Sequence, residues 1–329
     1  MFKRIIPRFR GPSFFLLVAA LIFPYVASQF QIDIATQVLL SSLGAIGLML
    51  LTGYAGQISL GHAGLIAAGA FSVAILTKEF SSPPWLCLIG ATFTGAMLGL
   101  LFGLPSLRLR GLYLAVSTLA MHFIVVYLGG EYETKRGFST GILVDSPSFA
   151  GYVIQSAKQW YYVLLGIAIG IFILASNLAR GPTGRAWRIV QTNETVAEAL
   201  GVRVDRSKLL AFVISSAITS FAGGLFAYYR GFVSIEAFSI YLSIQYVAMV
   251  IVGGMGSLFG AVLGAAFVTV FPYLIEALVM KMSFLGDQAG TLFAINYSAF
   301  GILMIMFLIF EPKGILGVLN RFSKKVTSP

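Results

Sequence analysis

The sequence predicts an all-α polytopic membrane protein, and the prediction rests on composition, the length of apolar segments and the placement of positive charge. Apolar residues make up 58% of the 329 residues, and charged residues 10%, against roughly 25% in soluble proteins. The net charge is +10, but the cations occupy short loops between apolar stretches and do not alternate with aromatic residues. We therefore interpret them as a signal of membrane orientation rather than of nucleic-acid binding.

Ten apolar segments have a length that suits a membrane-spanning helix, which needs about 20 mostly apolar residues. They are 13–30, 35–52, 61–77, 84–104, 112–128, 160–178, 209–229, 240–253, 258–280 and 292–310. Two of them, 61–77 and 240–253, are short and border glycine-rich stretches. These two are either full spans or segments that are broken or re-entrant.

The positive-inside rule orients these segments with both termini in the cytoplasm. In that arrangement 16 of the 22 lysines and arginines fall on the cytoplasmic side. The basic start followed by an apolar stretch also resembles a signal peptide, but Val26-Ala27-Ser28 is a poor cleavage site, so an uncleaved first helix is preferred.

We expect one transmembrane domain over 1–329, with an external polar segment at about 129–159 and a cytoplasmic one at about 180–208. Glycine-rich runs occur at 53–64 and again at 253–264, in corresponding places of the two halves. Such paired interruptions point to a transport pathway between repeats. Close helix packing through small residues explains them equally well.

The cytoplasmic segment contains the signals of two short helices. Pro182 and Gly184 are expected to break the preceding membrane helix. Residues 185–191 form the first short helix in this interpretation. Its polar and aromatic faces are expected to be exposed on Arg185, Trp187 and Arg188.

Asn193 (or Thr192) is placed to cap a second short helix over 194–200, and Gly201 to end it. The apolar residues of this helix recur at the 3–4 residue spacing of an amphipathic helix, namely Val196, Ala197 and Leu200. Two capped helices form a compact unit suited to docking in a groove of a cytoplasmic partner. The alternative is an ordinary basic loop.

These motifs, with others elsewhere in the chain, resemble the permease subunits (LivM type) of branched-chain amino acid ABC transporters. The matching stretches run in order from about residue 40 to 320. They are Gly53-Tyr-Ala-Gly-Gln-Ile-Ser-Leu-Gly-His-Ala-Gly64, Arg110-Gly-Leu-Tyr-Leu-Ala-Val-Ser-Thr-Leu-Ala120, Arg185-Ala-Trp-Arg188, Glu198-Ala-Leu-Gly201, Lys208-Leu-Leu-Ala-Phe-Val-Ile-Ser215, Gly253-Gly-Met-Gly-Ser-Leu-Phe-Gly260 and Phe310-Glu-Pro-Lys-Gly-Ile-Leu-Gly317. The run Met121-His-Phe123 departs from the family pattern, and that departure bears on substrate choice.

The resemblance implies a multi-pass permease of the bacterial inner membrane that works with a second permease subunit, two ABC ATPase subunits and a periplasmic substrate-binding protein. The sequence has no phosphate-binding loop of the G-x-x-x-x-G-K-[ST] type, so ATP hydrolysis is expected on separate chains, and this chain is expected to be neither an enzyme nor the holder of a cofactor. The expected substrates are branched-chain amino acids, with urea, amides or other amino acids as alternatives within the same family.

Two groups of residues carry the expected function. The ATPase-coupling loop comprises Arg185, Trp187, Arg188, Glu194, Glu198, Ala199 and Gly201. The translocation pathway comprises Gly53, Gln57, Ser59, Gly61, His62, Gly64, His122, Gly254, Gly256 and Ser257.

His62 and His122 are the only histidines, and we expect each to be neutral and hydrogen-bonded across helices rather than to relay protons. No Cys or acid cluster accompanies them, so no metal site is expected. The predicted span interiors lack carboxylates, which argues against the main rival, an ion-coupled secondary carrier. A membrane-embedded enzyme would need clustered acids, histidines or a nucleophile–base pair, and the sequence offers none.

Overall fold

The computed structural model describes residues 12–109, 111–138, 141–149, 151–281, 289–311 and 314–317, and this part of the chain is almost entirely helical. The α-helices are α1 (Pro12–Val26), α2 (Gln29–Leu48), α3 (His62–Phe80), α4 (Pro84–Ser106), α5 (Leu112–Lys135), α6 (Ala157–Arg180), α7 (Pro182–Thr192), α8 (Glu194–Ala199), α9 (Val204–Arg230), α10 (Ile240–Gly253), α11 (Leu258–Lys281) and α12 (Ala289–Phe310). A π-helical turn, η1 (Met49–Tyr54), extends α2, and a 3₁₀ turn, η2 (Ile235–Phe238), precedes α10.

Each of the ten expected apolar segments coincides with one of these α-helices, α7 and α8 being the two that remain. Seven helices are long and apolar enough to cross a membrane: α2 with η1, α3, α4, α5, α6, α9 and α11. The 14 residues of α10 and the central part of α12 are apolar but shorter, so the count of ten crossings stays a prediction. The chain therefore has the architecture of an all-α polytopic membrane protein.

The segment at 61–77 lies within an unbroken helix, because α3 runs without interruption from His62 to Phe80. The glycine-rich stretches instead separate helices, at 55–61 between η1 and α3 and at 254–257 between α10 and α11. Whether either stretch re-enters the membrane stays a prediction.

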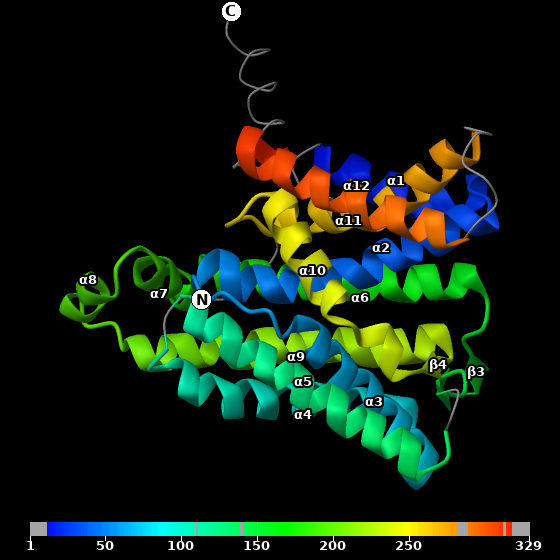
Figure 1. Cartoon of the computed structure of the whole chain (residues 1–329), viewed down its shortest axis with the longest axis horizontal. Coiled ribbons are helices and arrows are strands. Elements are labelled where there is room, and N and C mark those ends of the chain that lie inside the picture. The colour runs from blue at the N-terminus through cyan, green and yellow to red at the C-terminus, as the bar shows by residue number, and fades with distance from the viewer. Residues whose placement is uncertain are drawn as a thin grey trace, which may run out of the picture.

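The long helices run roughly side by side along one axis, as Figure 1 shows. The helix α9 packs against α3 and α4, and α2 packs against α6, α9 and α11. At one end of the bundle α7 and α8 project beyond the other helices, and the short strands lie at the opposite end (Figure 1). The two ends of the molecule are thus structurally distinct.

The strand end is assembled from the predicted external segment and the connection after α9. The strand β1 (Ile142–Leu143) pairs antiparallel with β4 (Phe232–Val233), and β2 (Ser148–Phe149) pairs antiparallel with β3 (Tyr152–Val153). The external segment at 129–159 is shorter than expected, because α5 continues to Lys135 and α6 begins at Ala157. Helical hydrogen bonding continues through the charged residues that follow the apolar stretch.

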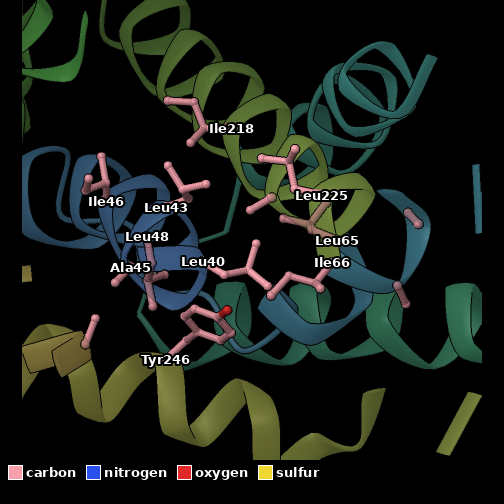
Figure 2. Packing of buried hydrophobic residues seen from close by; sticks show 14 of the residues in the cluster. Leu40, Leu43, Ala45, Ile46, Leu48, Leu65, Ile66, Ile218, Leu225 and Tyr246 are labelled. Carbon is pink, nitrogen blue, oxygen red and sulfur yellow. The ribbon is translucent and has the colours of Figure 1, made fainter. Parts of the chain in front are cut away.

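The core lies where α2, α3, α9 and α10 meet, and Figure 2 shows their side chains converging. The labelled residues are Leu40, Leu43, Ala45, Ile46 and Leu48 of α2, Leu65 and Ile66 of α3, Ile218 and Leu225 of α9, and Tyr246 of α10. Small residues bring α3 and α9 into backbone contact: a Cβ at Gly69 would overlap the Ser220 carbonyl, and one at Gly223 would overlap the Ile66 carbonyl. Close approach through small residues is a common way to associate helices in a membrane.

A Gly69→Val variant should therefore unfold at a lower temperature than the wild type, with a loss of about 1–3 kcal/mol from overpacking. The measurement is thermal unfolding of the purified protein in detergent. Gly170→Val is the matched control, because Gly170 lies on α6 with no atom within 4 Å of its virtual Cβ. Equal melting temperatures for the two variants would contradict the close crossing of α3 and α9.

Candidate functional site: the coupling loop and the glycine-rich segments

The loop at the projecting end of the bundle begins with an abrupt change of chain direction at Gly181. The helix α6 ends at Arg180, Gly181 is extended, and Pro182 occupies the first turn of α7. Proline is favoured there because the first helical N–H groups have no partner within the helix. The expected break of the membrane helix is confirmed, because α6 ends at Arg180 and Pro182 starts a new helix. Gly184 does not contribute to the break as expected, since it lies buried inside α7, against Ala179.

The second short helix, α8, has both of the ends that the sequence predicts. The Asn193 side-chain oxygen accepts hydrogen bonds from the backbone N–H of Thr195 at 2.9 Å and of Val196 at 3.2 Å. After the helix, Gly201 adopts φ +79°, a conformation that favours glycine. The predicted cap and stop signals are confirmed.

Trp187 holds the loop together instead of forming an exposed aromatic face. Its side chain is fully buried, and the indole Nε1–H donates to the Ser207 carbonyl at 2.9 Å. The expectation that Trp187 is exposed was wrong, because the start of α9 returns beside α7 and covers it. Arg185 and Arg188, by contrast, are exposed as expected.

A buried ion pair fixes α8 to α9. The ammonium group of Lys208 lies 2.6 Å from a carboxylate oxygen of Glu194, and only 2% of the Lys208 side chain is exposed. A charge removed from water in this way needs its partner close by. Glu194 therefore has a structural role in orienting α8.

Replacing this lysine with methionine should loosen α8 without disturbing the bundle. Lys208→Met leaves the Glu194 carboxylate without its closest cation, at a cost of about 1–3 kcal/mol. Hydrogen exchange of the amides at 193–203 should then become faster, and that of α3 should stay unchanged. Arg185→Met, which removes an exposed cation from the same loop, is the control and should leave the exchange at its wild-type rate.

The outward surface of α8 is partly apolar. Val196 is 50% exposed and Leu200 66% exposed, and Glu198, Ala199 and Gly201 are exposed beside them. Ala197 does not share this surface, contrary to expectation, because it is buried in a small cluster with Val190 and Val204. The helix α8 thus has an exposed apolar tip, and its other side is held by the Val190–Ala197–Val204 cluster and by the Glu194–Lys208 ion pair.

The coupling loop also contacts the first glycine-rich segment. The guanidinium of Arg188 lies over the Tyr54 ring, 5.1 Å from its centroid. A Cβ at Gly56 would lie 2.9 Å from Cγ of Gln191, so the segment passes directly against α7. Because these contacts are direct, a displacement of α7 would also displace residues 54–56.

The two glycine-rich segments meet each other at this end of the bundle. The Gly256 N–H points at the sulfur of Met49 at 3.3 Å, and a Cβ at Gly53 would lie 3.0 Å from the Gly256 nitrogen. Gly254 and Gly256 both have positive φ, and Ser257 accepts a hydrogen bond from Gly260 N at 3.3 Å as α11 begins. Segments about 200 residues apart in sequence thus form one contact.

Residues 55–61 are irregular but largely satisfied by local hydrogen bonds. Gln57 is buried and donates to the Ala55 carbonyl at 3.2 Å, and the buried Ser59 hydroxyl accepts from Gly61 N at 3.4 Å. Thr118 of α5 accepts from Leu60 N at 3.0 Å. Protein therefore surrounds this irregular backbone, an arrangement that is tolerated even inside a membrane.

His62, the first residue of α3, connects three helices. Its Nε2 lies 2.9 Å from the Gly44 carbonyl of α2 and 3.1 Å from the Thr219 hydroxyl of α9. A carbonyl only accepts hydrogen bonds, so Nε2 carries the proton. This geometry fits the expected neutral histidine bonded across helices.

His122 of α5 packs against Gly64 of α3: a Cβ at Gly64 would lie 2.7 Å from the His122 Cα. Gly61 is similarly close to the Thr118 carbonyl, so α3 and α5 approach each other closely here. In the part of the chain that the structure describes, His122 Nδ1 has no hydrogen-bond partner, so the expected hydrogen bond across helices is not found for this histidine. The structure thus brings the predicted pathway residues to one region of the bundle, and the contacts that it shows for them are packing contacts and local hydrogen bonds. Their role in a pathway stays a prediction.

A bundle of long apolar helices with an anchored two-helix loop at one end defines the class of the protein as a multi-pass α-helical membrane protein. The chain belongs to the family described as "Branched-chain amino acid transport system / permease component", whose model matches residues 30–310. This family consists of permease subunits of ABC importers and not of enzymes.

Several curated relatives support the same family. The chain is 30% identical to the high-affinity branched-chain amino acid transport system permease protein LivM of Salmonella typhimurium LT2, over 96% of this chain and 81% of that protein. It is 32% identical to LivM of Escherichia coli K12, over 92% and 73%. It is also 30% identical to the autoinducer 2 import system permease protein LsrC of Enterobacter sp. 638, over 70% and 66%. No solved structure matches the chain.

Proposed function

We propose that this chain is the permease subunit of an ATP-driven importer that carries branched-chain amino acids through a pathway shared with a second permease. The substrate assignment rests on the LivM relatives, which cover most of the chain. The LsrC relative is named for a different cargo, autoinducer 2, so the family is not restricted to one substrate. The alternative substrates that we propose are urea, amides or other amino acids.

The observation that carries the coupling role is the exposed tip of α8 on its anchored base. Val196 and Leu200 present an apolar surface. The Glu194–Lys208 ion pair and the buried Trp187 hold the loop against α9. A rigid apolar tip suits a groove on an ATPase subunit. In this proposal the α7–α8 end is cytoplasmic, the strand end faces a periplasmic binding protein, and both termini lie in the cytoplasm of a bacterial inner-membrane protein with a single domain.

In the proposed mechanism, closure of two ATPase subunits moves α8 as a rigid body. The movement passes through α7 to Tyr54 and Gly56, because Arg188 and Gln191 contact them directly. The glycine-rich segments then shift against each other, and the pathway opens alternately to each side. The buried side chains of Gln57, Ser59 and His62 lie where this shift takes place.

Site-specific photocrosslinking tests the coupling role. A photoreactive amino acid at Leu200 should give an adduct with an ATPase subunit of the importer in native membranes. The control position is Leu128 of α5, which is 60% exposed and lies near the opposite end of the bundle. Adducts at Leu128 alone, or in equal yield at both positions, would refute the assignment of α8 as the ATPase contact.

An ion-coupled secondary carrier remains the rival class. Glu133, which was predicted to lie in the external segment, is a buried residue of α5. It lies at the strand end of the bundle, beside η2 and two residues before α5 ends. A carboxylate at this position is far along the helix from the bundle centre, where a coupling acid is expected.

A further inference from the structure

A cavity of about 350 Å³ lies within the bundle, at the end opposite α7 and α8. Its walls come from the middle of α2, one residue of α3, the last turns of α9, the turn η2, α10 and the middle of α11. The volume falls within the range of about 300–1,000 Å³ that is usual for small-molecule sites. None of the residues predicted for the pathway lines it.

The walls combine an apolar surface with a few separated polar groups. Leu40 and Ile66 contribute aliphatic side chains, and Gln37 and Ser41, one turn apart on α2, contribute polar ones. The hydroxyl oxygen of Thr269 is buried and has no hydrogen-bond partner among the described residues. A buried hydroxyl without a partner costs free energy, so a polar ligand atom in the cavity would relieve it.

A cation stands at the mouth of the cavity. Arg230 ends α9, lies over the ring of Phe226 at 5.8 Å and is exposed. In the described part of the chain it forms no ion pair, whereas Arg136 at the same end pairs with Glu79 at 2.9 Å. Its planar donor array is therefore available to a carboxylate.

The inner end of the cavity is closed by Tyr246. In Figure 2 this ring extends from α10 toward Leu40 and Ile66. The ring lies 5.1 Å from the imidazole of His62, and a Cβ at Gly44 would lie 2.6 Å from its Cε1. One aromatic ring thus separates the cavity from the helix start where the glycine-rich segment ends.

We propose that this cavity is an amino-acid binding site of the permease itself, in which Arg230 binds the carboxylate and the aliphatic wall takes an apolar side chain. The hydroxyls of Ser41 and Thr269 accept hydrogen bonds from the ammonium group. The choice of an apolar amino acid rests on the proposed function. Tyr246 closes the site on the side of His62 until the glycine-rich segments move.

Direct binding to the full chain, without ATPases, tests the site. Tritiated L-leucine should bind saturably to the purified protein in nanodiscs, and leucinamide, which lacks the carboxylate, should not compete. Arg230→Gln should weaken binding by about tenfold or more, because it removes a charge-assisted hydrogen bond. Lys158→Gln is the matched control, since Lys158 is also an exposed cation over an aromatic ring, Tyr25, but lies outside the cavity.

Ala237→Trp gives a second variant that leaves the helices untouched, because Ala237 lies in η2 and is exposed at the cavity wall. It should block leucine binding while the melting temperature stays at the wild-type value. Binding that is absent in the wild type, or equal in the wild type, Arg230→Gln and Ala237→Trp, would overturn the site. A co-purified phospholipid that Ala237→Trp displaces would also overturn it. None of these results bears on photocrosslinking at Leu200. A failure of the cavity as a binding site is therefore distinguishable from a failure of the proposed function.

Discussion

A Val196→Asp, Leu200→Asp double variant is expected to reach the membrane in wild-type amounts and to lose substrate uptake. Both side chains are about half exposed or more at the tip of α8, so two carboxylates there do not disturb the bundle. In a partner groove they are buried without cations, and uptake should fall by about a hundredfold or more, as expected when central contacts of an interface are lost. The measurement is uptake of labelled leucine into cells, normalised to the amount of membrane-inserted protein.

Thr195→Asp is the control for this prediction, because Thr195 is exposed on the same helix and a negative charge in the first turn favours the helix. Its uptake should stay close to that of the wild type. Wild-type uptake by the double variant would show that α8 does not contact the ATPase. Equal loss in the control would show that any added charge on the loop is harmful.

The second large effect is expected at His62. His62→Leu removes the hydrogen bond to the Gly44 carbonyl and the contact with Thr219, which together join α3 to α2 and α9. The Gly44 carbonyl lies inside α2 and keeps its place in the helix, so the loss is that of one hydrogen bond between helices, about 0.5–1.5 kcal/mol. Because this bond fixes the start of α3 where the first glycine-rich segment ends, uptake should fall severalfold, up to about tenfold. ATPase co-purification should be unchanged, because the coupling loop is untouched.

His122→Leu is the matched comparison: both histidines are buried and both Nδ1 atoms lack a partner among the described residues, but only His62 has a hydrogen bond to another helix, through Nε2. We expect a smaller loss of uptake in this variant. Loss of complex assembly in His62→Leu, in place of a transport defect, would mean that His62 serves only to pack helices.

The apolar segments predicted the helices well, because apolar length and helix length are set by the same membrane thickness. The ends of the helices were harder to predict. The stretch counted to residue 128 belongs to a helix that ends at Lys135, because charged side chains stop the apolar count but not the backbone hydrogen bonds. The caps at Asn193 and Gly201 were predictable since both are local signals.

Contacts between distant parts of the chain were not predictable in this way. The pattern of 185–191 placed Trp187 on an exposed face, but the carbonyl that it binds belongs to Ser207, 20 residues further on. Similarly, nothing around Glu194 alone indicates that Lys208 neutralises it. The cavity beside Arg230 draws on five α-helices that are far apart in sequence, so no single motif marks it.

Uptake by purified protein in liposomes tests the central claim most directly. The account predicts that leucine accumulates only when this chain is reconstituted with the second permease and the ATPases, with ATP on the side of α8 and a loaded binding protein on the other side. Accumulation driven by an ion gradient in liposomes that contain this chain alone would contradict the account.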